Sequence, residues 1–285
     1  MRWKDGRRSS NVDDRRRVRL SGKAKGGGLG ILVLALIGMY FGIDPSIILQ
    51  QGERMSGDST MEQRQYAPSA AENQLADFVS VVLADTEDTW GKIFREGGST
   101  YQQPILVLFS GAVESACGFA QAAMGPFYCP ADKKVYIDLS FYQDLKNKMG
   151  APGDFAQAYV IAHEVGHHVQ NLLGISGKVH QMRSQISQGE YNQLSVRLEL
   201  QADCFSGVWA NHADRARQIL ETGDVKEALN AASMIGDDRL QKQSRGYVTP
   251  DSFTHGSSAQ RVRWFKKGLQ SGNLQTCDTF GAEQI

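Results

Sequence analysis

The chain contains 285 residues, 41% of them hydrophobic, and its formal net charge is zero. A chain of this length and composition can bury a sizeable core, and we expect one main domain. The charges are unevenly distributed, because residues 1–25 carry a net charge of +7 and the remaining residues carry −7. A basic block can bind nucleic acid, but an apolar run follows this one directly, so membrane topology explains it more simply. We therefore expect no nucleic-acid partner.

The apolar run begins at Gly26 and contains no charged residue as far as Ile43. It is slightly short for a membrane span of roughly 20 residues, and the apolar residues 47–49 can extend it. We predict a basic cytoplasmic leader at 1–25 and an uncleaved, single-pass transmembrane anchor at 26–49. Basic residues stay on the cytoplasmic side, so the body is expected outside, in a periplasm or cell-surface space. A cleaved signal peptide is the alternative, but the long leader and the lack of an Ala-x-Ala-like site argue against it.

Residues 50–72 are polar and show no apolar periodicity, which predicts a flexible linker. The main domain is predicted at 73–285 and opens with an amphipathic helix at 73–94. Apolar residues recur in this helix near helical spacing: Leu75, Phe78, Val79, Val82 and Leu83. Two apolar runs, 104–109 and 134–139, follow and are predicted to be strands. Helices are expected to dominate afterwards.

The sequence HEVGH at 163–167 lies in a helix predicted over 155–173. Positions i and i+4 share one face of a helix, so His163 and His167 can bind one metal ion. Glu164 lies about 100° round the helix and would face a water on that ion. This is the HExxH pattern of a zinc hydrolase. For the motif by itself, a chance match on an ordinary core helix is the alternative.

A second helix, predicted over 193–212, carries Glu199 and Asp203 one turn apart on one face. Catalytic zinc usually takes three protein ligands and leaves the fourth position to water, so we expect Glu199 to be the third ligand. A zinc-bound histidine donates its second N–H to an acceptor, and Asp203 is the candidate for that role. For an isolated ExxxD pattern, a solvated acidic stripe is the alternative interpretation.

Several longer segments carry a resemblance to a known family. They are HEVGHHVQ at 163–170, RLELQADCFSGVW at 197–209, GPFYCP at 125–130, VYIDLSF at 135–141 and FTHGSSAQRVRWF at 253–265. Together they resemble the neutral zinc metallopeptidases of bacteria, membrane-anchored enzymes of the zincin class. The resemblance runs from about Asn73 to the C-terminus. It implies an α+β, zincin-like fold that is mainly helical, with a small sheet beside the active-site helix, preceded by one N-terminal transmembrane helix.

The resemblance also implies a gluzincin-like site that binds one Zn²⁺ per chain through His163, His167 and Glu199. Glu164 is then the general base, and no motif position departs from the family pattern. Zinc lowers the pKa of a bound water from 15.7 to about 7, so Glu164 can take a proton near neutral pH and pass it to a leaving amine. The same ligand types also accept cobalt or manganese. The implied location is the bacterial inner membrane.

Thermolysin-like enzymes add a histidine or tyrosine donor for the oxyanion. His255, before a helix predicted over 259–269, is the candidate here, with Tyr247 behind it. The alternative is that His255 belongs only to the loop before a helix cap. His168 is expected to be exposed or to support the site indirectly, because it points away from the face that His163 and His167 share.

The expected substrate is a peptide or an unfolded protein segment. In zincins a strand beside the active-site helix commonly receives the substrate as an added strand. By resemblance, residues 135–139 or the segment near 112–115 can take this role. The alternative is a core strand with no exposed edge.

Four cysteines allow three pairings, and none has C-x-x-C spacing. We expect disulfides between Cys117 and Cys129 and between Cys204 and Cys277. Free buried thiols are the alternative.

Two functions from different classes remain open. The first is a membrane-anchored zinc endopeptidase that acts outside the cytoplasm. The second is a non-catalytic, zincin-shaped envelope protein with structural zinc that serves as a binding module. Glu164 favours the enzyme, because a structural zinc site closes four ligands and needs no base.

Overall fold

The computed structural model describes residues 1–21, 62–65, 67–122 and 125–285. Its largest sheet has four strands in the order β1-β4-β8-β7, so β7 forms one edge. β1, β4 and β8 run parallel, whereas β7 is antiparallel to β8. The bounds of these strands are Val12–Asp14 for β1, Ile105–Phe109 for β4, Lys134–Asp138 for β8 and Phe127–Cys129 for β7. The strands predicted at 104–109 and 134–139 are therefore confirmed.

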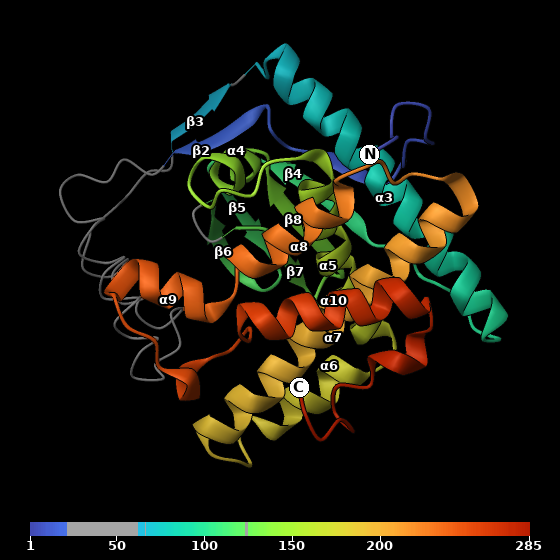
Figure 1. The fold of residues 1–285 in the computed structure, drawn as a ribbon. Helices are drawn as coiled ribbons and strands as arrows, with labels where there is room; N and C mark the ends of the chain where they lie inside the picture. Colours follow the sequence, from blue (N-terminus) through green and yellow to red (C-terminus); the bar gives the residue numbers. More distant parts are fainter. Residues whose placement is uncertain (22–61, 66, 123–124) are drawn as a thin grey trace.

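Two small two-stranded sheets accompany the main one. The first pairs β2 (Val18–Ser21) with β3 (Glu62–Gln65) in antiparallel fashion. The second pairs β5 (Ala112–Ser115) with β6 (Gly118–Gln121), also antiparallel. Figure 1 shows β2 and β3 at the outside of the molecule, beside the beginning of α3.

Helices make up most of the described chain, so the predicted α+β class with a predominance of helix is confirmed. They are α3 (Ala70–Glu96), α4 (Ser140–Asn147), α5 (Asp154–Leu172), α6 (Ile175–Met182), α7 (Gln188–Arg217), α8 (Asp224–Met234), α9 (Asp237–Arg245) and α10 (Ser258–Ser271), with short 3₁₀ turns η2 (Pro250–Ser252) and η3 (Leu274–Cys277). α3 and α7 extend beyond their predicted ends. Each begins at a capping box, Ser69 with Glu72 and Ser187 with Glu190, which satisfies backbone N–H groups of the first turn.

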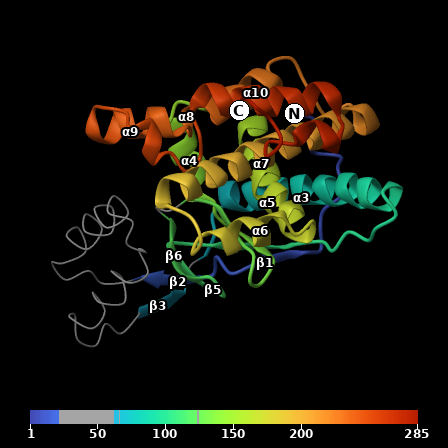
Figure 2. The same ribbon diagram turned by 90° about the horizontal axis from the view of Figure 1, so that it is seen from below.

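α5 and α7 lie between α10 and the main sheet, as Figure 2 shows. α10 packs very closely on α7, because a Cβ added at Gly268 would lie 1.9 Å from the carbonyl oxygen of Cys204. Only glycine permits this approach. The close packing places Arg261 of α10 in the buried space between α5 and α7, where it is 2% exposed.

The first residues of the chain belong to this body. β1 pairs with β4, Arg7 forms an ion pair with the buried Glu87 of α3 at 2.8 Å, and the Met1 ammonium lies 2.6 Å from Asp154 of α5. Arg16, 3% exposed, donates to the carbonyl oxygen of Glu72. The domain prediction separated residues 1–25 from a body that starts at residue 73, whereas residues 1–17 share the fold of that body. A sequence pattern could not show this, because the pairing joins segments about 90 residues apart.

No helix among the described residues is long and apolar enough to cross a membrane. The anchor predicted at 26–49 lies outside the described residues, as does most of the linker predicted at 50–72. The described end of that linker departs from the prediction, because residues 62–65 form β3 and residues 70–72 belong to α3.

The Asp154, Asp224 and Glu227 side chains form an acidic cluster, and the Met1 ammonium lies against it.

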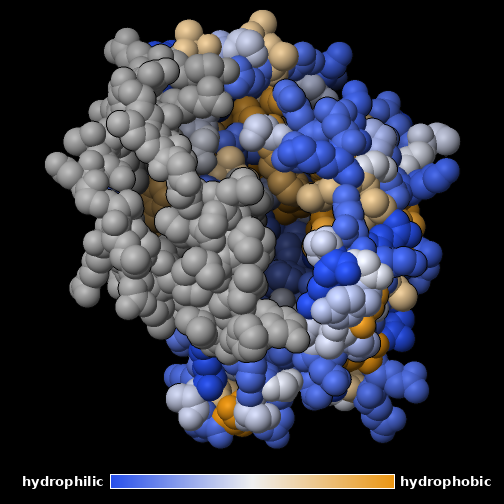
Figure 3. Space-filling model, turned by 90° about the vertical axis from the view of Figure 1, so that its left-hand side faces the viewer, coloured by the Kyte–Doolittle hydropathy of each residue, from blue (hydrophilic) through white to orange (hydrophobic). Residues whose placement is uncertain are grey.

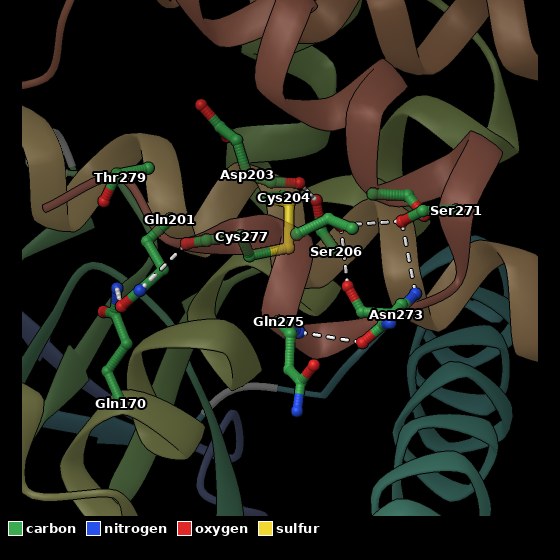
Figure 4. Close-up of a disulfide and its surroundings, with 12 residues drawn as sticks. Gln170, Gln201, Asp203, Cys204, Ser206, Ser271, Asn273, Gln275, Cys277 and Thr279 are labelled. Carbon is green, nitrogen blue, oxygen red and sulfur yellow. Dashed lines mark hydrogen bonds between the residues drawn. A yellow bond between two sulfur atoms is a disulfide. The ribbon is translucent and has the colours of Figure 1, made fainter. Parts of the chain in front are cut away.

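Both expected disulfides are present, Cys117 with Cys129 and Cys204 with Cys277. The second joins η3 to α7 and so holds the C-terminal tail on the helix that carries Glu199 (Figure 4). Gln201 adds a hydrogen bond to the carbonyl oxygen of Cys277 at 3.0 Å.

We expect the Cys204–Cys277 disulfide to stabilise the fold more than the Cys117–Cys129 disulfide, because it closes a loop of 73 residues rather than 12. Replacing Cys204 and Cys277 with alanine should lower the free energy of unfolding by about 4 kcal/mol, against about 3 kcal/mol for Cys117 and Cys129. Urea unfolding of the two double variants measures both values. The reverse order would contradict the prediction.

Candidate active site

The two helices that carry the predicted metal ligands approach each other closely at Gly166, the glycine inside the HExxH motif. A Cβ added there would lie 3.0 Å from the carbonyl oxygen of Ala202 on α7. Because Gly166 has no side chain, α7 can lie against α5. This contact brings Glu199, three residues before Ala202, to the face of α5 that carries His163 and His167.

Three side chains converge at this point. The Nε2 atoms of His163 and His167 are 3.2 Å apart, and the two carboxylate oxygens of Glu199 lie 3.1 Å from the first and 3.3 Å from the second. A tetrahedral zinc ion with bonds of about 2.0–2.1 Å separates its ligand atoms by about 3.3–3.4 Å. The structure therefore brings together all three predicted ligands at the spacing that zinc requires.

The hydrogen bonds that each imidazole makes through Nδ1 determine which ring nitrogen faces Glu199. His163 Nδ1 lies 2.9 Å from the Asp203 carboxylate, which only accepts, so Nδ1 carries the proton. His167 Nδ1 donates to Gln170 Oε1 at 2.9 Å, and Gln170 Nε2 donates to the Leu198 carbonyl oxygen, which settles the orientation of this amide. Both Nε2 atoms then face the Glu199 carboxylate. This donor set fits a cation and suits Zn²⁺ in particular.

The electrostatics agree with a cation site. The two imidazoles hold the pKa of Glu199 well below its usual range, although burial works in the opposite direction. Burial lowers the pKa of His163, but Asp203 and Glu199 outweigh burial and raise the pKa to about 9. The surroundings of His163 therefore stabilise positive charge at the point where the three ligand atoms meet.

Asp203 lies beside His163 Nδ1, where the sequence predicts an acceptor, and it is fully buried. Arg261 forms two hydrogen bonds to its carboxylate, at 2.9 and 3.0 Å, and the Tyr159 hydroxyl donates a third. Burial raises the pKa of Asp203, but Arg261 and His163 outweigh burial and lower it, so the group is a carboxylate. A buried carboxylate with several donors holds the His163 ring firmly.

Sequence reasoning missed Arg261, Tyr159 and Gln170. Arg261 had a usable signal, because it lies at helical spacing with Trp264, Phe265 and Gly268 on the buried face of α10. A charged residue on an otherwise apolar helix face needs a buried partner of opposite charge. Tyr159 and Gln170 had no such signal, because their roles depend on how α5 and α7 pack together.

Glu164 and His255 both line the cleft over the metal site, whose volume is about 510 Å³. Burial raises the pKa of Glu164, which suits a group that takes and returns a proton near neutral pH. His255 is held through Nδ1 by Asp237 at 3.3 Å and by Thr254. Partial burial lowers the pKa of His255, whose side chain is 52% exposed, but Asp237 and Glu199 raise the pKa overall. An imidazole in this place can donate a hydrogen bond to an oxyanion.

Tyr247 does not line the cleft. Its side chain is exposed and lies under the Arg245 guanidinium, 5.1 Å from the ring centre. His168 points away from the metal site, as predicted, but it is fully buried rather than exposed. It bonds to the carbonyl oxygen of Gln102 and to the hydroxyl of Tyr128, and so links α5 to the strand β7.

The strand that lines the cleft is β7, with Phe127 and Tyr128 among the lining residues. The two segments proposed by resemblance do not have this position. β8, which contains most of the segment 135–139, lies between β4 and β7 and has no free edge, as the alternative of a core strand expected. The segment at 112–115 is β5, and none of its residues is among those that line the cleft.

The comparisons with known proteins agree with this site. The profile of a family described as "Putative neutral zinc metallopeptidase" matches residues 1–280. The chain is 54% identical to the protein YpfJ of Escherichia coli K12, over 99% of both chains. It is 40% identical to the protein Rv2575 of Mycobacterium tuberculosis H37Rv, over 87% of this chain and 86% of that relative. No solved structure matches the chain significantly. The family match includes the N-terminal residues, where the sequence resemblance was placed only from about Asn73.

We expect Asp203→Asn to lower the affinity for zinc about 10- to 100-fold, because a neutral amide holds the His163 ring less firmly. Asp214→Asn, on the same helix but away from the metal site, is the matched control and should keep the affinity. Competition with a chelating dye measures both affinities, and circular dichroism verifies that both variants fold. Equal affinities would show that Asp203 does not orient the ligand.

Proposed function

Because the chain belongs to the neutral zinc metallopeptidase family, we propose that it is a zinc-dependent endopeptidase that hydrolyses bonds in peptides or unfolded protein segments. One observation carries the proposal: three ligand atoms converge at zinc spacing beside Glu164, in an open cleft. Among the described residues, the candidate ligands at this point are His163, His167 and Glu199. Three ligands leave a fourth position for water or substrate, which is the pattern of a catalytic zinc site.

Each residue of the site has a separate role in the proposed reaction. His163, His167 and Glu199 would hold Zn²⁺, which would polarise the scissile carbonyl and allow a water to ionise near neutral pH. Glu164 is the group that would take a proton from the attacking water and return it to the leaving amine. His255, oriented by Asp237, donates a hydrogen bond to the carbonyl oxygen as negative charge develops there. Asp203 and Gln170 hold the two imidazole rings so that both Nε2 atoms are directed at the metal position.

The free edge of β7 is the proposed place for the substrate backbone. β7 borders the cleft along α5, because Gly125 lies against Phe141 near one end and Asn171 of α5 bonds to Tyr128 near the other. A peptide in extended conformation can pair with an exposed strand edge through main-chain hydrogen bonds. Such pairing gives affinity with little selection of sequence, which suits unfolded segments as substrates.

The alternative is a non-catalytic envelope protein in which zinc is structural. A structural site closes four ligands, whereas Asp203 here bonds to a ligand instead of facing the metal. A structural zinc site also does not need a buried carboxylate such as Glu164 in the cleft. Both features favour the peptidase.

We expect Glu164→Gln to bind one zinc ion per chain as the wild type does, and to cleave an unfolded substrate such as casein about 10²- to 10⁴-fold more slowly. The reason is that an amide of the same shape cannot take the proton. Glu114→Gln, an exposed change on β5, is the control and should cleave normally. Metal analysis and a casein assay give the two readouts.

If zinc-loaded wild-type protein cleaves nothing across a broad peptide library, the structural-zinc alternative replaces the peptidase. If Glu164→Gln cleaves as fast as the wild type, the general base is another group.

We also propose that the body works outside the cytoplasm and that the apolar run within 26–49 attaches it to the bacterial inner membrane. Two disulfides support an oxidising compartment.

The packing of the N-terminal residues limits how the apolar run can be arranged in the membrane. Residues 1–17 share the fold of residues 67–285, and Ser21 pairs with Glu62, so both flanks of the run lie side by side. A single crossing would separate them by the bilayer, roughly 30 Å. We therefore propose that both flanks lie on the outer side.

Labelling of single added cysteines tests this topology. Ser10→Cys and Ser99→Cys place exposed thiols before and after the run. We expect a membrane-impermeant maleimide to label both in spheroplasts to the same extent. Labelling of Ser10→Cys only after the membrane is broken would restore the single-pass arrangement with the leader inside. Labelling of neither before breakage would place the body in the cytoplasm.

A further inference from the structure

Two buried amide side chains connect the proposed metal site to the C-terminal tail, residues 273–285. Gln170 holds the His167 ring through Oε1, and its Nε2 donates to Gln201 Oε1 at 3.1 Å. Gln201 Nε2 in turn donates to the carbonyl oxygen of Cys277 at 3.0 Å. Gln170 is fully buried and Gln201 is 5% exposed. The series of hydrogen bonds from His167 to the tail therefore runs through the protein interior.

Backbone carbonyl oxygens fix the direction of this series. The oxygen of Cys277 only accepts, so Gln201 presents Nε2 to Cys277 and Oε1 to Gln170. Gln201 Oε1 and the Leu198 carbonyl oxygen both accept from Gln170 Nε2, which leaves Gln170 Oε1 to accept from His167. If the Cys277 end came away, the Gln201 amide could turn, and Gln170 would lose one of the two acceptors that hold it.

The tail also binds α7 on both sides of Glu199. Before Glu199, Thr279 Oγ1 donates to the carbonyl oxygen of Arg197 at 2.6 Å, and the Arg197 guanidinium donates to two carbonyl oxygens of the tail. After Glu199, the disulfide between Cys204 and Cys277 joins the tail to α7 covalently. The turn of α7 that carries the third proposed ligand is therefore the part that the tail holds.

The tail lies outside the cleft over the metal site. Figure 3 views the molecule from the side of α9, whose Leu240 lines the cleft, and shows a hollow with a hydrophilic floor on that face. None of the described residues that line the cleft belongs to the tail. An effect of the tail on the proposed site therefore passes through the ligands His167 and Glu199.

We infer that Gln201 is a positioning residue for the metal site, and that the disulfide-held tail strengthens zinc binding through it. Gln201 keeps Gln170 in place, and Gln170 keeps the His167 ring directed at the metal position. Groups that orient a metal-bound histidine from behind change the affinity for the metal when they are altered. The inference rests on the zinc site of the proposed function.

The first experiment measures the zinc affinity of Gln201→Met by competition with a chelating dye. Methionine has a similar length and removes both hydrogen bonds of Gln201. We expect the affinity to fall about 3- to 10-fold, which is less than the roughly 10- to 100-fold expected for a direct partner of a ligand, because Gln201 acts through Gln170. An affinity equal to that of the wild type overturns the inference.

Asn211→Leu is the matched control on the same helix. It removes the hydrogen bond of 2.7 Å from Asn211 to the carbonyl oxygen of Leu269, which joins α7 to α10 and has no part in the series. We expect Asn211→Leu to keep the zinc affinity of the wild type. Urea unfolding of both variants shows how much stability each has lost, so that a loss of affinity is distinguished from a loss of stability.

The second experiment tests whether the tail acts through Gln201. Replacing Cys204 and Cys277 with alanine should lower the zinc affinity of the otherwise wild-type protein by about the same factor as Gln201→Met does. In the Gln201→Met background the same two replacements should have almost no further effect, because the series is already broken. A disulfide that only stabilises the fold would lower the affinity by one factor in both backgrounds, and that result overturns the inference.

Cobalt provides a readout that does not require the alanine variants to fold, because the same ligands accept Co²⁺. The disulfide is intact in Gln201→Met, and we expect the visible absorption bands of its cobalt-loaded form to differ from those of the wild type. The bands of Asn211→Leu should match the wild type. Identical bands in all three proteins overturn the inference.

The outcomes also separate this inference from the proposed function. If the wild-type protein binds zinc but cleaves nothing, the proposed function fails, and the zinc affinities still decide the role of Gln201. If the wild-type protein binds no zinc, both fail together.

Discussion

Two imidazole nitrogens and a carboxylate are directed at one point and lie 3.1–3.3 Å apart, so a positive charge, from a metal ion or a proton, is needed between them. The rest of the architecture serves to hold this arrangement. Gly166 allows α7 to approach α5, and Gly268 allows α10 to approach α7. α10 thereby places Arg261 beside Asp203. An unpaired Asp203 in this interior would be very costly, so the arginine is required for the carboxylate to stay charged.

The positions of the proposed metal ligands were largely predictable, because they follow from residue spacing within single helices. Histidines at i and i+4 and carboxylates one turn apart need only a helix to share a face, and the supporting role of Asp203 follows from the need of a ligand histidine for an acceptor. Residues that act across elements were not predictable in this way. Gln170 supports His167 only because α7 supplies the carbonyl oxygen of Leu198, and β7 borders the cleft only because it is the last strand of the sheet.

The sequence interpretation did not foresee that the N-terminal residues pack on the main domain. It explained their basic residues by net charge, which matched a cytoplasmic leader next to an apolar run. In the structure several of these charges have individual partners: Arg7 with Glu87, Arg8 with Asp77, and Arg16 with Asp14. Asp14 is two residues from Arg16, whereas Asp77 and Glu87 lie 69 and 80 residues from their arginines. A sum of charges over a segment carries no information about such pairs.

The amide side chains around the tail connect the disulfide to the candidate metal site. The Cys277 carbonyl oxygen accepts from Gln201, Gln201 accepts from Gln170, and Gln170 accepts from the His167 ring. Figure 4 shows the part of this series from Gln170 to Cys277. The disulfide therefore fixes the outer end of a series whose inner end orients a proposed metal ligand. Before the two thiols are oxidised, no covalent bond holds the Cys277 end of the series on α7.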